Sequence, residues 1–155
     1  MVLKLDGSVW TTGWNQYGQI GEGSTIDRAD YVQVISSGAQ TITAGSRHSI
    51  VLKQDGSVWA TGYNQYGQLG DGSTTNREVF VQVISDEVEA IAAGAFHSMV
   101  LKWDGSIWAT GSNRDGQFGD GSTTSVETFV NIVPIDSGVA HDLIRKHSHQ
   151  THYFP

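Results

Sequence analysis

Two sets of carboxylates recur along this chain, and carboxylates are among the side chains that acid–base catalysis and metal binding use. One set stands before Gly-Ser and the other before Gly-Ser-Thr: Asp6, Asp55 and Asp104, and Glu22, Asp71 and Asp120. Aspartate before glycine forms turns, and a carboxylate two residues before serine accepts local backbone hydrogen bonds. No Ser-His-Asp grouping stands outside the repeated pattern. We therefore predict structural roles for both sets and expect no enzymatic activity.

Histidines form two further groups. Three occupy equivalent positions of the pattern and three lie close together at the end of the chain: His48, His97 and His141, and His147, His149 and His152. Repeat symmetry could bring the first group around one axis, where it would suit a metal, but we predict hydrogen-bonded structural side chains. In an extended tail residues 147 and 149 share a face, which makes the second group a candidate nickel or zinc site. A solvated or tag-derived tail is the alternative, and we expect no cofactor.

Composition excludes several classes of function. The 155 residues carry a net charge of −7, whereas nucleic-acid binding normally needs a basic surface, so we expect no nucleic-acid partner. The chain has no cysteine, which excludes a disulfide framework and a cysteine-based metal site. No apolar run reaches the about 18 residues of a membrane-spanning helix, so we expect no membrane partner. None of these observations assigns a compartment.

A repeat with a period of 49 residues carries these side chains. The motif Gly-Gln-x-Gly-x-Gly-Ser-Thr begins at Gly18, Gly67 and Gly116. A fixed period of this size indicates a propeller, a solenoid or an array. The third copy is five residues shorter near its end. We therefore assign residues 1–146 to three repeats and residues 147–155 to a C-terminal tail.

Each repeat contains four short apolar runs that have the length and composition of strands. In the second unit they span residues 80–84, 90–93, 98–101 and 106–110. Asp55-Gly56 predicts a type I′ hairpin turn between two such strands. The neighbours Val58 and Trp59 are both apolar and point to opposite faces of a strand, so both faces of the sheet need cover, as in stacked blades. We predict that the glycine-rich segment is a structured loop between the third and fourth strands, with Leu69 beneath it.

The conserved spacing within the repeat resembles that of a known family. Trp59-Ala-Thr-Gly-x-Asn64-x-x-Gly-Gln-Leu-Gly-Asp-Gly, followed by Ile91-Ala-Ala-Gly-x-x-His97-Ser, closely resembles the repeat of the regulator of chromosome condensation 1 (RCC1) family, in the compact form of its microbial members. The resemblance implies an all-β propeller that serves as an interaction platform. Family roles include nucleotide exchange on a small GTPase and chromatin binding. No segment is long enough for the exchange wedge, and the acidic charge disfavours chromatin.

Three units of four antiparallel strands are too few for the usual ring of such a propeller. The chain is a fragment of a larger propeller, an open array of three blades, or part of a ring that closes by oligomerisation. We expect the last of these, because two copies joined head to tail in a homodimer would give a six-bladed ring.

Positions that differ between the copies are the best candidates for binding, because loops on a rigid scaffold commonly carry function. Aromatic and arginine side chains, which are frequent interface anchors, occupy several of them. We predict that these residues bind the partner: Trp14, Tyr17, Tyr63, Tyr66, Arg47, Phe96 and Arg114. We expect a non-enzymatic module that binds a protein. A lectin that stacks glycan rings on the aromatics, or a fragment or engineered propeller with only a structural role, are the alternatives.

Overall fold

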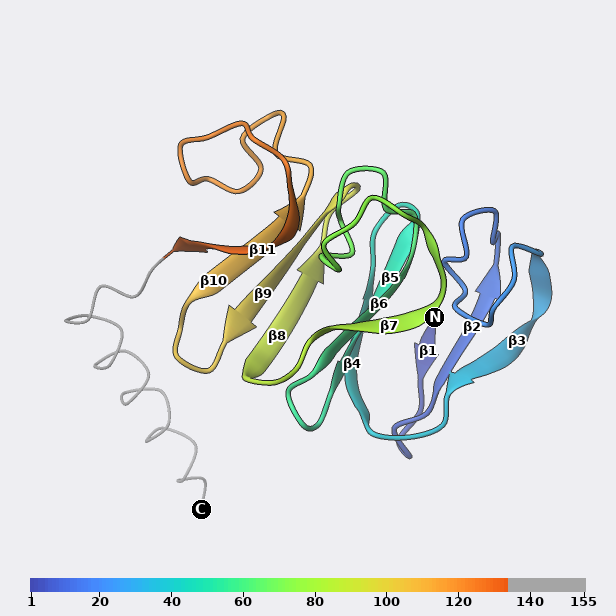
Figure 1. Ribbon diagram of the computed structural model, residues 1–155. Coiled ribbons are helices and arrows are strands. Elements are labelled where there is room, and N and C mark those ends of the chain that lie inside the picture. Colours follow the sequence, from blue (N-terminus) through green and yellow to red (C-terminus); the bar gives the residue numbers. More distant parts are fainter. Residues whose placement is uncertain (134–155) are drawn as a thin grey trace, which may run out of the picture.

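The computed structural model describes residues 1–133, and strands form all the regular structure in that range. Three antiparallel sheets follow one another along the chain (Figure 1). The first contains β1 (Val2–Leu3), β2 (Val9–Gly13) and β3 (Arg28–Ile35). The second contains β4 (Ala39–Ala44), β5 (His48–Lys53), β6 (Val58–Gly62) and β7 (Arg77–Ile84). The third contains β8 (Val88–Ala93), β9 (His97–Lys102), β10 (Ile107–Gly111) and β11 (Val126–Val133).

The sheet order follows the chain order, so each strand pairs with its neighbour in sequence. In the second sheet β5 pairs with β6 from His48 opposite Gly62 to Leu52 opposite Val58. The prediction of an all-β chain with four antiparallel strands per unit is confirmed for the second and third sheets. The glycine-rich loop lies between the third and fourth strands of its sheet, as predicted. The shortened end of the third repeat and the tail fall outside the described residues.

The type I′ assignment of the Asp-Gly turns is wrong. Such a turn needs positive φ at both central residues, but Gly56 has a φ of 80° and Asp55 does not have a positive φ. The amide of Gly56 donates to the carbonyl of Lys53 at 3.0 Å, which leaves a three-residue loop that ends in a left-handed glycine. Oδ1 of Asp55 accepts the amide of Ser57 at 2.9 Å. This Asx interaction gives the aspartate a local role that does not require left-handed backbone.

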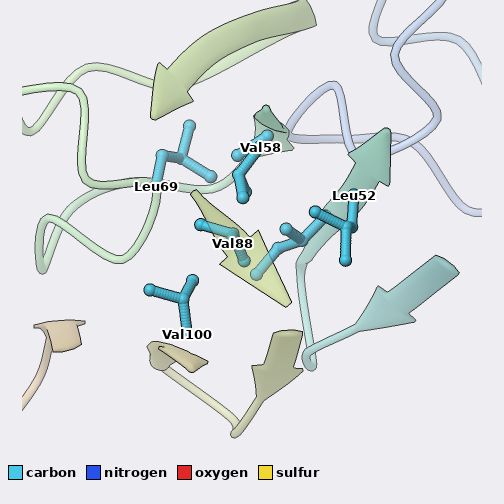
Figure 2. Packing of buried hydrophobic residues seen from close by; sticks show 7 residues of the cluster. Leu52, Val58, Leu69, Val88 and Val100 are labelled. Carbon is cyan, nitrogen blue, oxygen red and sulfur yellow. The ribbon is translucent and has the colours of Figure 1, made fainter. Parts of the chain in front are cut away.

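The largest hydrophobic cluster joins the second sheet to the third. Figure 2 shows Leu52 and Val58 from the second sheet packed with Val88 and Val100 from the third, and with Leu69 from the glycine-rich loop. Leu69 is 1% exposed, as the sequence predicts. Full burial of a leucine contributes about 2 kcal/mol, so the loop is part of the core that holds neighbouring sheets together.

Candidate functional site

A buried asparagine fixes the shape of each glycine-rich loop. Oδ1 of Asn64 accepts the amide of Leu69 at 2.9 Å, and Nδ2 donates to the carbonyls of Ser73 at 2.9 Å and Thr75 at 3.1 Å. Asn15 and Asn113 hold the same position in the other two loops, and all three side chains are fully buried. Because one side chain satisfies three backbone groups, the loop has a fixed shape and so do the residues on either side of the asparagine.

The repeated carboxylates hold local structure. Oδ2 of Asp71 accepts Nε of Arg77 at 2.7 Å, and Oδ1 accepts the amide of Ser73 at 3.1 Å. Burial raises the pKa of Asp71, but the hydrogen bonds from Arg77, Ser73 and Asn64 outweigh it and the net shift is downward. Glu22 accepts Nε of Arg28 at 2.8 Å in the first loop. The hydroxyl and amide of Ser57 lower the pKa of Asp55 in the hairpin turn.

His48 connects the second sheet to the third. Its Nε2 lies 3.0 Å from Oγ of Ser98, and that hydroxyl donates its hydrogen to the carbonyl of Gln68 at 2.6 Å. Nε2 must therefore carry a hydrogen and donate it to Ser98, which leaves Nδ1 bare. Burial, together with the nearby His97, lowers the pKa of His48 to about 4. The neutral imidazole thus has the structural role expected for it.

The structure tests the prediction of metal-binding histidines only within residues 1–133. Residues 1–133 contain no group of three or more histidine, aspartate or glutamate side chains that could hold a metal ion. His141 and the tail histidines lie outside the described residues: His147, His149 and His152.

Aromatic side chains of the first two glycine-rich loops and of the turn between β8 and β9 form one continuous row. The rings of Trp14 and Tyr17 meet edge to face with their centroids 5.4 Å apart, and Tyr17 meets Tyr63 at 4.8 Å. Tyr63 contacts both Tyr66 at 6.1 Å and Phe96 at 6.2 Å, and these two are 5.2 Å apart. Each edge-to-face pair contributes about 0.5–1.5 kcal/mol beyond its buried area, so the rings hold one another in place.

Two arginines complete this aromatic–arginine row. The guanidinium of Arg47 lies 5.2 Å from the ring centroid of Tyr17 and 5.8 Å from those of Trp14 and Tyr63. It also donates a hydrogen bond to the hydroxyl of Tyr17 at 3.3 Å. Arg114 lies 5.0 Å from the ring centroid of Tyr66. Among the described residues neither arginine pairs with a carboxylate, so their hydrogen-bond donors remain available in a chain that is acidic overall.

The row lies where the strands end in loops, opposite the hairpin turns. The amide of Tyr63 donates to the carbonyl of Arg47 at 2.8 Å, just beyond the paired ends of β5 and β6. Trp14 is 46% exposed, whereas Tyr63 and Phe96 are half-buried. All seven residues singled out in the sequence therefore come together. Reasoning from sequence missed Gln68, whose Oε1 accepts the amide of Tyr66 at 3.1 Å; its identity in all three repeats was the available signal.

Comparisons with known proteins give the family. The model described as the regulator of chromosome condensation (RCC1) repeat matches residues 6–52 and 55–101, and a second model of that description matches residues 39–68 and 88–117. No curated protein sequence matches the chain. Within the described residues no helix is long and apolar enough to span a membrane.

Solved structures show the same fold. Human WBSCR16 has 20% sequence identity and a TM-score of 0.74 over 88% of this chain and 37% of its own. Yeast RCC1 (Prp20) bound to Kap60 has 20% identity and a TM-score of 0.74 over 85% of this chain and 34% of its own. Prp20p from Saccharomyces cerevisiae, described with its binding to Gsp1p and histones, has 21% identity and a TM-score of 0.76 over 85% and 35%.

The chain thus spans little more than a third of the length of these structures. The repeat matches cover most of its own length, and they coincide with the strands and loops described above. The chain belongs to the regulator of chromosome condensation (RCC1) repeat family.

Proposed function

We propose that this chain is a non-enzymatic interaction module that binds a protein partner through the aromatic–arginine row. One observation carries the proposal. Side chains that keep their identity in every repeat, such as Asn64 and Gln68, fix the shape of the loops, whereas seven aromatic and arginine side chains at positions that differ between the copies meet in one continuous surface. A binding platform is expected to have this arrangement, in which the residues of the scaffold are the same in every repeat and the residues of one surface differ.

The chemistry of the row suits a protein interface. Tryptophan, tyrosine and arginine are enriched among the residues that dominate binding energy. The ring contacts and the stacking of Arg47 restrict the side chains before binding, which lowers the entropy lost when a partner binds. The edges of the guanidinium groups remain free to donate to carboxylates or carbonyls of the partner. The structural neighbours give general support, since yeast RCC1 (Prp20) is described with the proteins Kap60, Gsp1p and histones.

A glycan-binding surface is the second candidate. The exposure of Trp14 favours it, because a sugar ring stacks on an accessible aromatic face. The edge-to-face packing of Tyr17, Tyr63 and Tyr66 weighs against it, since neighbouring rings cover part of each face. A lectin of repeats would also present near-equivalent sites, whereas the third unit has Arg114-Asp115 in place of Gln65-Tyr66.

We also propose that the sheets are blades of a closed ring, and that two copies of the chain complete six blades. The meander order of the four-stranded sheets and the core shared between them support this assembly. A closed ring would remove the open faces that three stacked sheets leave at their ends.

Site-specific photo-crosslinking tests the binding proposal. A photoreactive residue replaces Trp14 in the row or, as a control, Trp103, which is 57% exposed in the hairpin turn after β9. Both chains are expressed in the source cells, and crosslinked proteins are identified by mass spectrometry. We expect one protein to crosslink from position 14 and not from position 103. Equal crosslinking from both positions, or glycan-array binding without a protein adduct, would contradict the proposal.

A further inference from the structure

The first and second glycine-rich loops also form the contact, here called a seam, with the following sheet. In the first seam Oγ1 of Thr61 donates to the carbonyl of Gly18 at 2.9 Å, and the amide of Gly23 donates to the carbonyl of Glu78 at 2.8 Å. The second seam repeats both bonds 49 residues later. Oγ1 of Thr110 donates to Gly67 at 2.8 Å, and the amide of Gly72 donates to Glu127 at 3.0 Å.

Shape complementarity in the seam depends on one glycine and one aromatic ring. A Cβ on Gly21 would lie 2.5 Å from the ring of Phe80, and a Cβ on Gly70 would lie 2.5 Å from the ring of Phe129. Only glycine lets the ring pack so closely. The third loop has the same sequence pattern, but a Cβ on Gly119 would meet no atom of the described residues within 4 Å. A seam has two sides, a glycine-rich loop and the third and fourth strands of the following sheet. Within the described residues the third loop therefore provides the loop side of a seam without the strand side.

The first sheet provides the strand side of a seam without a loop, because β2 and β3 are equivalent to β6 and β7. The single hydroxyl hydrogen of Thr61 is shared between the carbonyls of Gly18 and Arg77, at 2.9 and 2.8 Å. The hydroxyl of Thr12 lies 2.8 Å from the carbonyl of Arg28 and has no loop carbonyl to match Gly18 within the described residues. Tyr31 occupies the position of Phe80 and Phe129 and is 54% exposed.

A groove beside Tyr31 is also open. In the second sheet the equivalent groove contains Lys53, Trp59 and Phe80, and residues 21 and 34–37 of the preceding unit form its other side. In the first sheet the groove is lined by Val2, Lys4, Trp10 and Tyr31. The described residues of the chain supply no preceding unit to cover this groove.

We propose that the loop of residues 116–121 in one copy of this chain docks on β2 and β3 of a second copy and forms a third seam. The described residues contain both sides of such a seam, the loop of residues 116–121 and the strands β2 and β3. The two internal seams predict the contacts between them. Thr12 donates to the carbonyl of Gly116, the amide of Gly121 donates to the carbonyl of Ala29, and Tyr31 packs on Gly119. The inference rests on the proposed ring and identifies the surfaces that close it.

One pair of residues distinguishes this seam from the internal ones. Isolated β-bridges join Glu22 to Val79 in the first seam and Asp71 to Thr128 in the second. The equivalent pair across two copies is Asp120 and Asp30. Like charges directly opposite each other weaken strand pairing, so this seam is weaker than the internal ones. Asp30→Thr, which supplies the residue type of the second seam, is expected to tighten the dimer by up to about fivefold.

Disulfide crosslinking tests the pairing directly, because the chain has no cysteine of its own. Bridge partners have Cα atoms about 4.5–5.5 Å apart, within the range that a disulfide spans. We mix Asp30→Cys with Asp120→Cys under mild oxidation and, as a control, Asp30→Cys with Asp55→Cys, which lies in a hairpin turn. A covalent dimer from the first mixture alone supports the seam. No dimer, or equal yields from both mixtures, overturns it.

The mass of the whole chain in solution provides the second test. Sedimentation equilibrium is measured for the unchanged chain, for Tyr31→Glu and for the control Trp103→Glu. We expect a dimer that Tyr31→Glu weakens at least about thirtyfold and that the control leaves unchanged. A monomer at all concentrations would overturn the inference and would leave the seam to further units of a longer polypeptide. Partner crosslinking at position 14 does not depend on this result, so the two proposals fail separately.

Discussion

His48 makes the stability of this protein depend on pH between about 4 and 6.5. Burial lowers its pKa from 6.5 to about 4. Below pH 6.5 His48 is protonated in the unfolded chain, whereas in the folded chain it stays neutral until the pH approaches 4. The stabilisation is therefore fully present above pH 6.5 and is lost as the pH falls toward 4.

The magnitude follows from the size of the pKa shift. One pKa unit corresponds to 1.36 kcal/mol, so acidification to pH 4.5 removes roughly 2–3 kcal/mol of unfolding free energy through His48. The structure explains the shift, because Nε2 already donates to Ser98 and Nδ1 is buried without a partner among the described residues. The pKa values of Glu22, Asp55 and Asp71 are lowered from their ordinary values, so their contribution to stability is lost as the pH falls through these lowered values.

Urea unfolding of the unchanged chain and of His48→Gln at several pH values between 7.5 and 4.5 measures this effect. We expect the unfolding free energy of the unchanged chain to fall by roughly 2–3 kcal/mol more than that of the variant. His97→Gln is the matched control, since His97 is less buried and its pKa is lowered by burial alone. Parallel pH profiles for the unchanged chain and His48→Gln would refute the reasoning.

Three further predictions concern the loops. Asn64→Ala removes the acceptor of the Leu69 amide and should lower the unfolding free energy by about 2–3 kcal/mol in urea titrations, whereas Gln65→Ala in the same loop should change it little. In the same urea titrations Asp71→Ala should lower the unfolding free energy by about 1 kcal/mol more than Asp120→Ala does. The reason is that Arg77 pairs with Asp71, whereas Val126 stands at the equivalent position in the third repeat. Gly70→Ala should lower the melting temperature more than Gly119→Ala in the Tyr31→Glu background: both glycines have positive φ, but only Gly70 has Phe129 against it.

The repeat made most of the fold predictable. A position that recurs every 49 residues must serve the same structural purpose each time, so the strands, the loop and the burial of Leu69 could be inferred from one copy and checked in the others. The predicted type of the hairpin turn was wrong because the pair Asp-Gly does not reveal that the aspartate carboxylate accepts a hydrogen bond from the amide of Ser57. Local side-chain bonds of this kind compete with the turn type that composition favours.

The candidate site was predictable as a set of residues but not as an arrangement. Variation between copies identified Arg47, but its position against Tyr17 and Tyr63 depends on how two neighbouring units pack. The bond between His48 and Ser98 has the same origin, since it joins residues of different sheets. The ion pair of Arg77 with Asp71 is local and was missed, although its spacing recurs in the first repeat as Arg28 and Glu22.

A binding titration with the purified partner tests most directly whether the aromatic–arginine row is the binding surface. Trp14→Ala and Trp103→Ala remove exposed tryptophans from opposite ends of the sheets, and both side chains are exposed enough to spare the fold. We expect Trp14→Ala to weaken the affinity at least about tenfold and Trp103→Ala to leave it within about twofold. Equal affinities for the two variants, or a greater loss from Trp103→Ala, would contradict this expectation.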